Sequence, residues 1–332
     1  MEVLVVKGTP YQMGYQIGSF YKDILEKEVK VFKDALDNDE KLREKLALIK
    51  DKLHYDHADV YEELKGRAEG SCTDVDAFIL MNSSELYSVG EQCTTVMIKD
   101  NNSECFFSHN EDDSDFTDEN TCVIKYVYDD HYEIGYTSCK KLVGCCYGAN
   151  SYGMVFSSNY LYPPKVNVSN VSRTILSREL YKARSIEEAI EMVRNLRVAA
   201  GFSFNVFDLN NKEMVNIEKD LDAIYVTKVA DRYARSNHFL CIDGPEYSAS
   251  SKFRYEKSKE LVDLLDNKNL NSEKVRECLT YETDDYFKSI HKASYQKGAQ
   301  ASITVSNMSI DSINRTMCIV DYLGGREYSF DL

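Results

Sequence analysis

Residues 93–112 read CTTVMIKDNNSECFFSHNED. Two runs of apolar and β-branched residues flank a segment of Asp, Asn and Ser, a pattern typical of two antiparallel strands joined by a turn. Similar runs, each bounded by Asn, Asp, Ser or Gly, follow at residues 122–128, 132–136 and 153–156. We therefore expect successive antiparallel strands from Cys93 onward.

The chain before this stretch has a helical periodicity. Apolar residues in the segment 42–53 recur at spacings of four, three and four among charged residues, which predicts an amphipathic helix. Nearer the start, Pro10 suits a first helical turn. Gly14 and Gly18 lie one turn apart, so another backbone could approach that face. We expect the first quarter of the chain to be mainly helical.

The order of elements along the rest of the chain predicts the fold class. Strands, helices, strands, helices and closing strands follow one another, as in α+β proteins whose helices layer against antiparallel sheets. No repeat, low-complexity tract or Pro/Gly-rich linker divides the sequence. We expect one structural domain, in which a mainly helical segment, residues 1–92, packs on a larger segment, residues 93–332.

Composition excludes several functions. The 332 residues carry 40 Lys and Arg against 55 Asp and Glu, a formal charge of −15, which disfavours contact with nucleic acid or an anionic bilayer. No apolar run approaches the ~18 residues of a membrane span. The opening MEVLVVKG does not resemble a secretory signal. We therefore expect a cytoplasmic protein without nucleic-acid or membrane partners.

The ten cysteines predict neither disulfides nor a metal site. Their spacing is irregular and no C-x-x-C pair occurs, so they are typical of reduced thiols in a reducing compartment. Common nucleotide-binding signatures are also missing. We expect no metal and no organic cofactor.

Short polar motifs occur in a fixed order over nearly the whole chain. They are Gly8-Thr-Pro-Tyr-x-x-Gly-x-x-x-Gly18, Cys93-Thr94-Thr95, Asn110-x-Asp112, Gly148-x-Asn150-x-x-Gly153 with Asn159, Ser236-Asn237-His238 and Ser251-x-x-Arg254-Tyr255. In this order they resemble the acyl-coenzyme A:6-aminopenicillanic acid acyltransferase family, which belongs to the N-terminal nucleophile hydrolases. The resemblance implies an αββα four-layer sandwich, with two antiparallel sheets between helical layers.

The resemblance also implies that the chain cuts itself between Gln92 and Cys93. Residues 1–92 would then be an α chain or propeptide, and residues 93–332 a β chain that begins with the nucleophile. A free α-amine has a pKa of ~7.7 to 8.0 and a thiol one of ~8.5, so the new terminus can accept the thiol proton near neutral pH. That base does not exist before the cut.

Four further residues match functional positions of the family or of the related conjugated bile acid hydrolases. The resemblance implies that Asp112 orients the α-amine and that the amide of Asn237 points into an oxyanion hole. Asn159 matches a second asparagine of the bile acid hydrolases. Arg254 resembles an arginine that helps to keep the Cys93 thiol ionised. Two neutral donors aimed at an oxyanion are what acyl transfer requires.

Each of these residues also has a purely structural interpretation. Cys93 could be an inert buried thiol, because free cysteine is often buried. Asp112 could be a surface acid, and Arg254 a solvated helical residue. Asn159 and Asn237 could be turn residues at strand ends.

The sequence departs from the family pattern at the carboxyl end, which lacks the usual Gly-Asn-Pro, and at two places near the expected site. Gln92 stands where the acyltransferases have Gly, which makes the strained backbone of an N-to-S acyl shift harder to adopt. Glu111 and Asp113 stand where the family has tryptophans, so negative charge is added beside the expected site.

The implied activity is that of a self-processing amidohydrolase or acyltransferase. Cys93 would form a thioester with the acyl group of an N-acylated small molecule or peptide, and an acyl-coenzyme A is a candidate acyl donor. Two alternatives stay open: a choloylglycine-type bile acid amidase, and an uncleaved, catalytically silent protein that binds an acyl ligand. The 92 residues before the nucleophile favour the acyltransferase branch, because the bile acid enzymes remove little more than the initiator Met.

Overall fold

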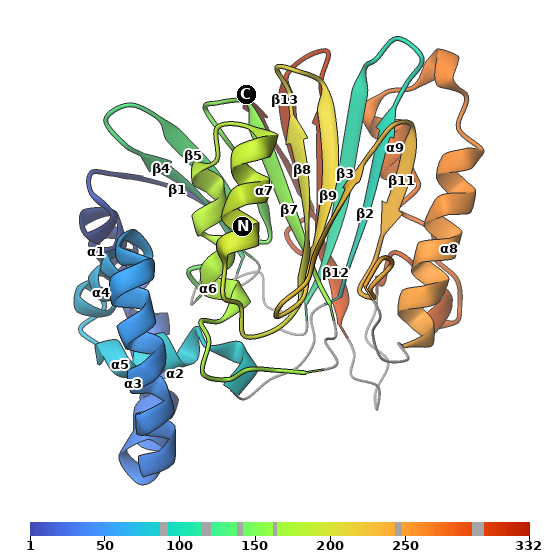
Figure 1. The fold of residues 1–332 in the computed structure, drawn as a ribbon. Coiled ribbons are helices and arrows are strands. Elements are labelled where there is room, and N and C mark those ends of the chain that lie inside the picture. The colour runs from blue at the N-terminus through green and yellow to red at the C-terminus, as the bar shows by residue number, and fades with distance from the viewer. Residues whose placement is uncertain (87–91, 114–120, 138–141, 162–164, 243–247, 294–301) are drawn as a thin grey trace.

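Two stacked β-sheets form the centre of the molecule in a computed structural model, which describes residues 1–86, 92–113, 121–137, 142–161, 165–242, 248–293 and 302–332 (Figure 1). The first sheet has eight strands in the order β1 (Glu2–Lys7), β4 (Cys122–Val127), β5 (Tyr132–Thr137), β6 (Tyr147–Asn150), β7 (Met154–Tyr160), β8 (Phe202–Asp208), β9 (Glu213–Lys219) and β10 (Ile224–Lys228). The second has six, in the order β11 (Arg232–Arg235), β2 (Gln92–Lys99), β3 (Cys105–Asp113), β12 (Ile303–Asp311), β13 (Thr316–Asp321) and β14 (Arg326–Asp331).

Strand pairing agrees with the expected antiparallel pattern except at one edge. The six-stranded sheet is antiparallel throughout. In the eight-stranded sheet, β1 pairs with β4 in parallel. In the described part of the chain, five α-helices and two strands of the other sheet lie between β1 and β4, and such a long connection allows the parallel direction.

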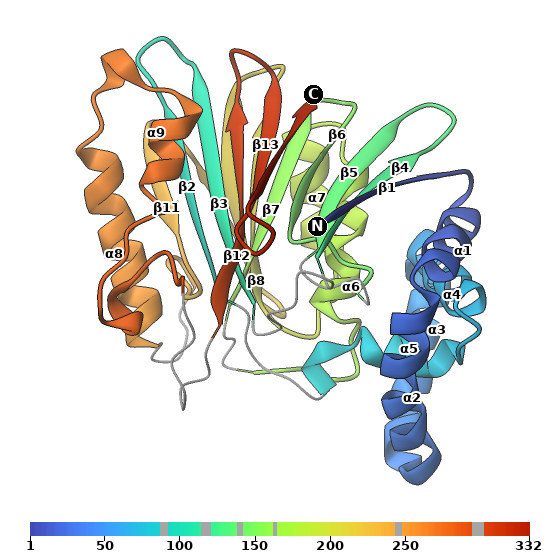
Figure 2. The same cartoon turned by 180° about the vertical axis from the view of Figure 1, so that it is seen from behind.

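Helices cover the outer face of each sheet. The eight-stranded sheet is covered by α6 (Arg173–Ser177), η3 (Glu179–Lys182) and α7 (Ile186–Asn195). The six-stranded sheet is covered by α8 (Ala249–Asp263) and α9 (Ser272–Glu277), near the short turns η4 (Asn267–Asn269) and η5 (Tyr286–Lys288) (Figure 2). An apolar cluster that includes Met97, Phe107 and Val155 fills the space between the sheets. The four-layer sandwich is therefore confirmed.

The amino-terminal segment is mainly helical, as predicted, and packs beside β1 (Figure 1). It contains α1 (Pro10–Phe20), α2 (Lys22–Asn38), α3 (Glu40–Asp56), α4 (Ala58–Gly70), α5 (Val75–Met81) and η1 (Ser84–Leu86). Its apolar side chains join one core with strands of the eight-stranded sheet. None of the helices in the described ranges is long and apolar enough to cross a bilayer.

Close packing of α1 on α4 explains the two glycines of the opening motif. A Cβ atom on Gly14 would lie 2.2 Å from the Glu63 carbonyl oxygen, and one on Gly18 would lie 2.1 Å from the Arg67 carbonyl oxygen. Neither distance can accommodate a side chain. The expectation that another backbone approaches these glycines is confirmed.

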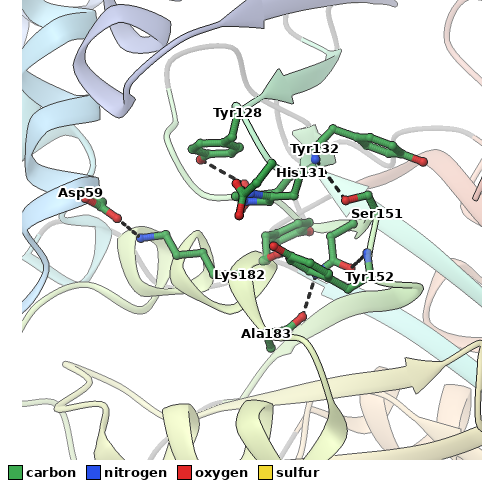
Figure 3. Close-up of polar contacts among 12 residues, drawn as sticks. Asp59, Tyr128, His131, Tyr132, Ser151, Tyr152, Lys182 and Ala183 are labelled. Atoms are coloured by element: carbon green, nitrogen blue, oxygen red, sulfur yellow. Dashed lines mark hydrogen bonds and ion pairs between the residues drawn. The ribbon is translucent and has the colours of Figure 1, made fainter.

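Buried ion pairs also join the amino-terminal helices to the rest of the molecule. Glu63 of α4 accepts from Nε of Arg178 at 3.0 Å, and Arg178 also pairs with Glu133 of β5. These three side chains are almost fully buried. Nearby, Asp59 of α4 pairs with Lys182 of η3 at 2.8 Å (Figure 3). Segment 1–86 is therefore attached to the sheets by an apolar core, a strand pair and buried charges.

Candidate active site

Cys93 is the second residue of β2 and lies in the interior, with 1% of its surface exposed. Side chains alternate along a strand, so Cys93 faces the same side as Met97, which belongs to the core between the sheets. Its backbone N–H donates to Oδ1 of Asn237 at 3.0 Å, and its carbonyl oxygen accepts from Nη1 of Arg254 at 2.7 Å. Side chains from late in the chain therefore hold both backbone groups of this residue.

Asn237 and Arg254 also contact each other. Nη2 of Arg254 donates to Oδ1 of Asn237 at 2.7 Å, and Nδ2 of Asn237 donates to the Tyr160 carbonyl oxygen at 3.0 Å. Arg254 belongs to α8 and is fully buried, so it is not a solvated helical residue. Nδ2 of Asn237 is bonded to the Tyr160 carbonyl oxygen, and Oδ1 of the same side chain faces the Cys93 N–H.

The Cys93 thiol faces polar groups rather than hydrocarbon. Sγ donates to Oε2 of Glu111 at 3.2 Å, and the same oxygen lies 3.1 Å from Nε2 of His109. On the other side of the imidazole, Nδ1 lies 2.8 Å from Oγ1 of Thr95. Burial lowers the pKa of His109 to about 3, so its imidazole is neutral near pH 7. The thiol therefore begins a buried chain of proton donors and acceptors.

Asn159 of β7 lies at the far end of this chain of contacts. Its Oδ1 accepts from Oγ1 of Thr95 at 2.9 Å and from Nδ2 of Asn205 at 2.8 Å. Its own Nδ2 is buried and has no hydrogen-bond partner among the described residues. Asn159 and Glu111 both line a cavity of about 40 Å³. Asn159 thus supplies a buried amide donor at a small cavity beside the thiol's partner.

Asp112 directly follows Glu111, the residue that pairs with Cys93 across β2 and β3. Strands β2 and β3 form the expected antiparallel hairpin, in which Cys93 pairs with Glu111 and Gln92 pairs with Asp112. Oδ2 of Asp112 lies 3.0 Å from Nζ of Lys292, and that ammonium also contacts Oε1 of Gln92. Asp112 is fully buried, so the surface-acid interpretation is wrong.

Lys292 has an unusual environment for an amine. It is almost completely buried, and burial lowers its pKa to about 8 although Asp112 opposes the shift. Its polar partners are the side chains of Gln92, which contributes the carbonyl group of the Gln92–Cys93 peptide, and Asp112, which pairs with Gln92 across β2 and β3. A buried cation therefore lies beside the bond at which cleavage is expected.

Three residues of this site were not predicted from the sequence as functional groups. Glu111 was noted only as a departure from the family pattern, although the register of the hairpin puts it opposite Cys93. His109 lies two residues earlier in β3 and so shares the face of Glu111. Lys292 lies about 200 residues after Cys93 in the chain, and no sequence signal marked it.

The sequence profile of the acyl-coenzyme A:6-aminopenicillanic acid acyl-transferase family matches residues 98–309, almost two thirds of the chain. The chain belongs to this family. Asp112, Asn159, Asn237 and Arg254 lie inside the matched range, which begins five residues after Cys93. Membership places the protein among enzymes that transfer or hydrolyse acyl groups.

Solved structures share the fold of this family member. The chain is similar to the N-acylethanolamine-hydrolyzing acid amidase ortholog of Caenorhabditis elegans, with a TM-score of 0.50 and 13% identity over 66% of this chain and 93% of that one. It is also similar to a variant of the conjugated bile acid hydrolase of Clostridium perfringens, with a TM-score of 0.51 and 10% identity over 72% and 92% of the two chains. At these identities the likeness supports the N-terminal nucleophile hydrolase fold alone.

Proposed function

We propose that this protein is a self-processing cysteine N-terminal nucleophile enzyme that cleaves or transfers the acyl group of an N-acylated small molecule or peptide. The observation that carries the proposal is the environment of Cys93. Its backbone N–H is held by Asn237 and its thiol faces Glu111, so both atoms of the future nucleophile already have polar partners.

The first step is cleavage of the Gln92–Cys93 peptide. Glu111 takes the thiol proton across the 3.2 Å contact, and Sγ attacks the Gln92 carbonyl carbon. An S–C bond forms and the C–N bond breaks, while the departing nitrogen takes up a proton and becomes the α-amine of Cys93. Water then hydrolyses the thioester, which leaves a Gln92 carboxylate and a free thiol.

In the mature enzyme the new α-amine would replace Glu111 as the base. The 3.0 Å bond from the Cys93 nitrogen to Oδ1 of Asn237 would persist and orient the amine, and the fully buried Arg254 would fix Asn237. We assign Asn237 this orienting role because its own Nδ2 is bonded to the Tyr160 carbonyl. Asp112, held by Lys292 beside the cut, would favour the protonated amine.

Substrate turnover would use the same sulfur atom. The thiolate attacks the substrate's amide carbonyl, its oxygen becomes an oxyanion, and the unpaired Nδ2 of Asn159 supports a role as donor to that oxygen. The amine leaves with the proton taken from the thiol, and an acyl thioester remains on Cys93. Water or an acceptor amine then removes the acyl group. Besides the N-acylated substrate, an acyl-coenzyme A is a second candidate donor of the acyl group.

We place the activity in the cytoplasm, a proposal that the free cysteines recorded throughout the described ranges support. The test of self-processing is the intact mass of purified protein. Cleavage predicts pieces of 92 and 332 − 92 = 240 residues. The Cys93→Ala variant is expected to stay whole. Cys278→Ser is a matched control, since Cys278 is also buried but lies at the end of α9, outside the site.

Two results would contradict the proposal. One is a wild-type chain that stays whole and shows no thiol-dependent amidase activity on a panel of N-acyl amides, which would favour the acyl-binding protein. The other is cleavage at 92 that persists in Cys93→Ala, which would point to an external protease.

A further inference from the structure

Three groups of the kind that bind metal ions converge at Cys93. Sγ of Cys93, Nε2 of His109 and the nearer carboxylate oxygen of Glu111 all lie within 4.8 Å of one another, and all three residues are buried. Among the described residues this is the one cluster of three or more His, Cys, Asp or Glu side chains with such geometry. The cluster includes the proposed nucleophile, so an ion bound there would act on the reacting sulfur.

The fold holds these groups on two neighbouring strands. Cys93 of β2 pairs directly with Glu111 of β3, and His109 lies two residues before Glu111 on the same face. The Oγ1 atom of Thr95 contacts the second imidazole nitrogen of His109 at 2.8 Å. A partner of this kind orients the ring of a metal-binding histidine. Central strands of a sheet thus preorganise the three groups.

The separations between the groups fit a small tetrahedral ion. Bonds of ~2.3 Å to sulfur and ~2.0 Å to oxygen or nitrogen give ligand-to-ligand edges of roughly 3.3 to 3.5 Å around zinc. The observed distances are 3.2 Å between Sγ of Cys93 and Oε2 of Glu111, and 3.1 Å between that oxygen and Nε2 of His109. These two edges need shifts of only a few tenths of an ångström. The third edge, between Sγ of Cys93 and Nε2 of His109, lies within 4.8 Å and would have to close to roughly 3.5 Å when the ion binds.

Charge and space also favour a divalent ion. A thiolate and a carboxylate together carry two negative charges, which one divalent ion neutralises in a buried place. Glu111 also lines the cavity of about 40 Å³. That volume exceeds the ~10 to 15 Å³ that one water requires, so there is room for a water beside the Glu111 carboxylate. Three protein ligands and one open position are typical of non-structural zinc sites.

We propose that Cys93, His109 and Glu111 bind Zn²⁺, or an ion of the same class, and that the bound ion withholds the nucleophile. On binding, the Cys93 thiol releases its proton to solvent and the sulfur donates its lone pair to the metal. The sulfur can then attack neither Gln92 nor a substrate. The inhibitory effect rests on the function proposed above, whereas the binding itself does not. The spacing of the cysteines could not reveal this site, because its ligands come from two strands.

The binding test uses Co²⁺ as a spectroscopic probe. Reduced, chelator-treated protein titrated with Co²⁺ should show a thiolate-to-cobalt charge-transfer band that saturates at one ion per chain, and Zn²⁺ should abolish it. Cys93→Ala should lose the band, and His109→Gln should weaken binding by more than the ~10- to 100-fold typical of losing an outer partner. Cys278→Ser should bind as the wild type does.

A wild-type chain without the band, or a band that survives in Cys93→Ala, would overturn the site. Glu111→Gln provides a second ligand variant if His109→Gln does not fold, which circular dichroism reports. The inhibition test measures alkylation of Cys93 by iodoacetamide. Zn²⁺ should block it, a chelator should restore it, and His109→Gln should need a correspondingly higher Zn²⁺ concentration. A chain that binds Co²⁺ but never cleaves itself would refute the proposed function and leave the metal site intact.

Discussion

Replacing Glu111 with glutamine removes the proton acceptor of the Cys93 thiol while keeping the shape of the side chain. The two residues pair directly across β2 and β3, and Sγ lies 3.2 Å from Oε2. At this separation, an effective dielectric constant of about 20 gives a repulsion of about 5 kcal/mol between a thiolate and an ionised carboxylate. In the uncleaved chain, where Cys93 has no free α-amine, a thiolate therefore forms next to Glu111 only if the proton moves onto that carboxylate.

This repulsion sets the expected size of the effect. A positioned general base contributes ~10²- to 10⁴-fold to a reaction rate, so Glu111→Gln should slow self-cleavage by a factor in that range. Alkylation of Cys93 should not slow, because the variant also removes the negative charge that disfavours the thiolate. Slower cleavage without slower alkylation distinguishes a base from a residue that only supports the fold.

The assay is a time course of cell-free synthesis, followed on denaturing gels and by iodoacetamide labelling. Glu327→Gln is a matched control, because Glu327 accepts from the Cys318 thiol at 2.9 Å far from the site. It should cleave as the wild type does. Wild-type cleavage kinetics in Glu111→Gln would refute the assignment of the base.

Contacts elsewhere in the molecule give further predictions. Asn159→Leu should lower kcat of the mature enzyme ~10²- to 10³-fold with little change in KM, as measured by steady-state kinetics, because it removes the proposed oxyanion donor. The two fragments should coelute on gel filtration and separate only in denaturant. Glu63→Gln should lower the free energy of unfolding by about 3 to 5 kcal/mol in urea titrations, because the buried Arg178 loses its charged partner. Gly18→Ala should lower Tm by several degrees in a thermal melt, because its Cβ would meet the Arg67 carbonyl oxygen at 2.1 Å. Burial lowers the pKa of Lys292 from 10.5 to about 8. The unfolded chain therefore binds more protons than the folded chain between these values, and the free energy of unfolding increases as the pH rises. Urea titrations at pH 8 and 10 should show that Lys292→Gln loses about 2 kcal/mol of this increase.

Local patterns in the sequence predicted much of the fold. Alternation and turn residues in 93–112 identified the central hairpin, and the spacing of Gly14 and Gly18 identified a close helix contact. The parallel pairing of β1 with β4 was not predicted, because no local signal records the partner of an edge strand. The four-layer αββα arrangement came from a family resemblance, and the order of helices and strands agreed with it.

The site was predicted less completely than the fold. The order of the motifs predicted that Cys93, Asn237 and Arg254 belong to one site, and in the structure hydrogen bonds link the three residues. The groups that face the thiol were missed because they depend on strand register, which sets Glu111 opposite the nucleophile. Lys292 depends on a tertiary contact between distant segments, which one sequence does not encode in any local pattern.

Amino-terminal sequencing of the larger fragment tests the central claim most directly. Protein made by cell-free synthesis with protease inhibitors should yield a fragment whose first residues are Cys-Thr-Thr-Val-Met, with the α-amine free. The Cys93→Ala chain made in parallel should give only its original amino terminus. A wild-type fragment that begins at any other residue, or a wild-type chain that never divides, would contradict the account.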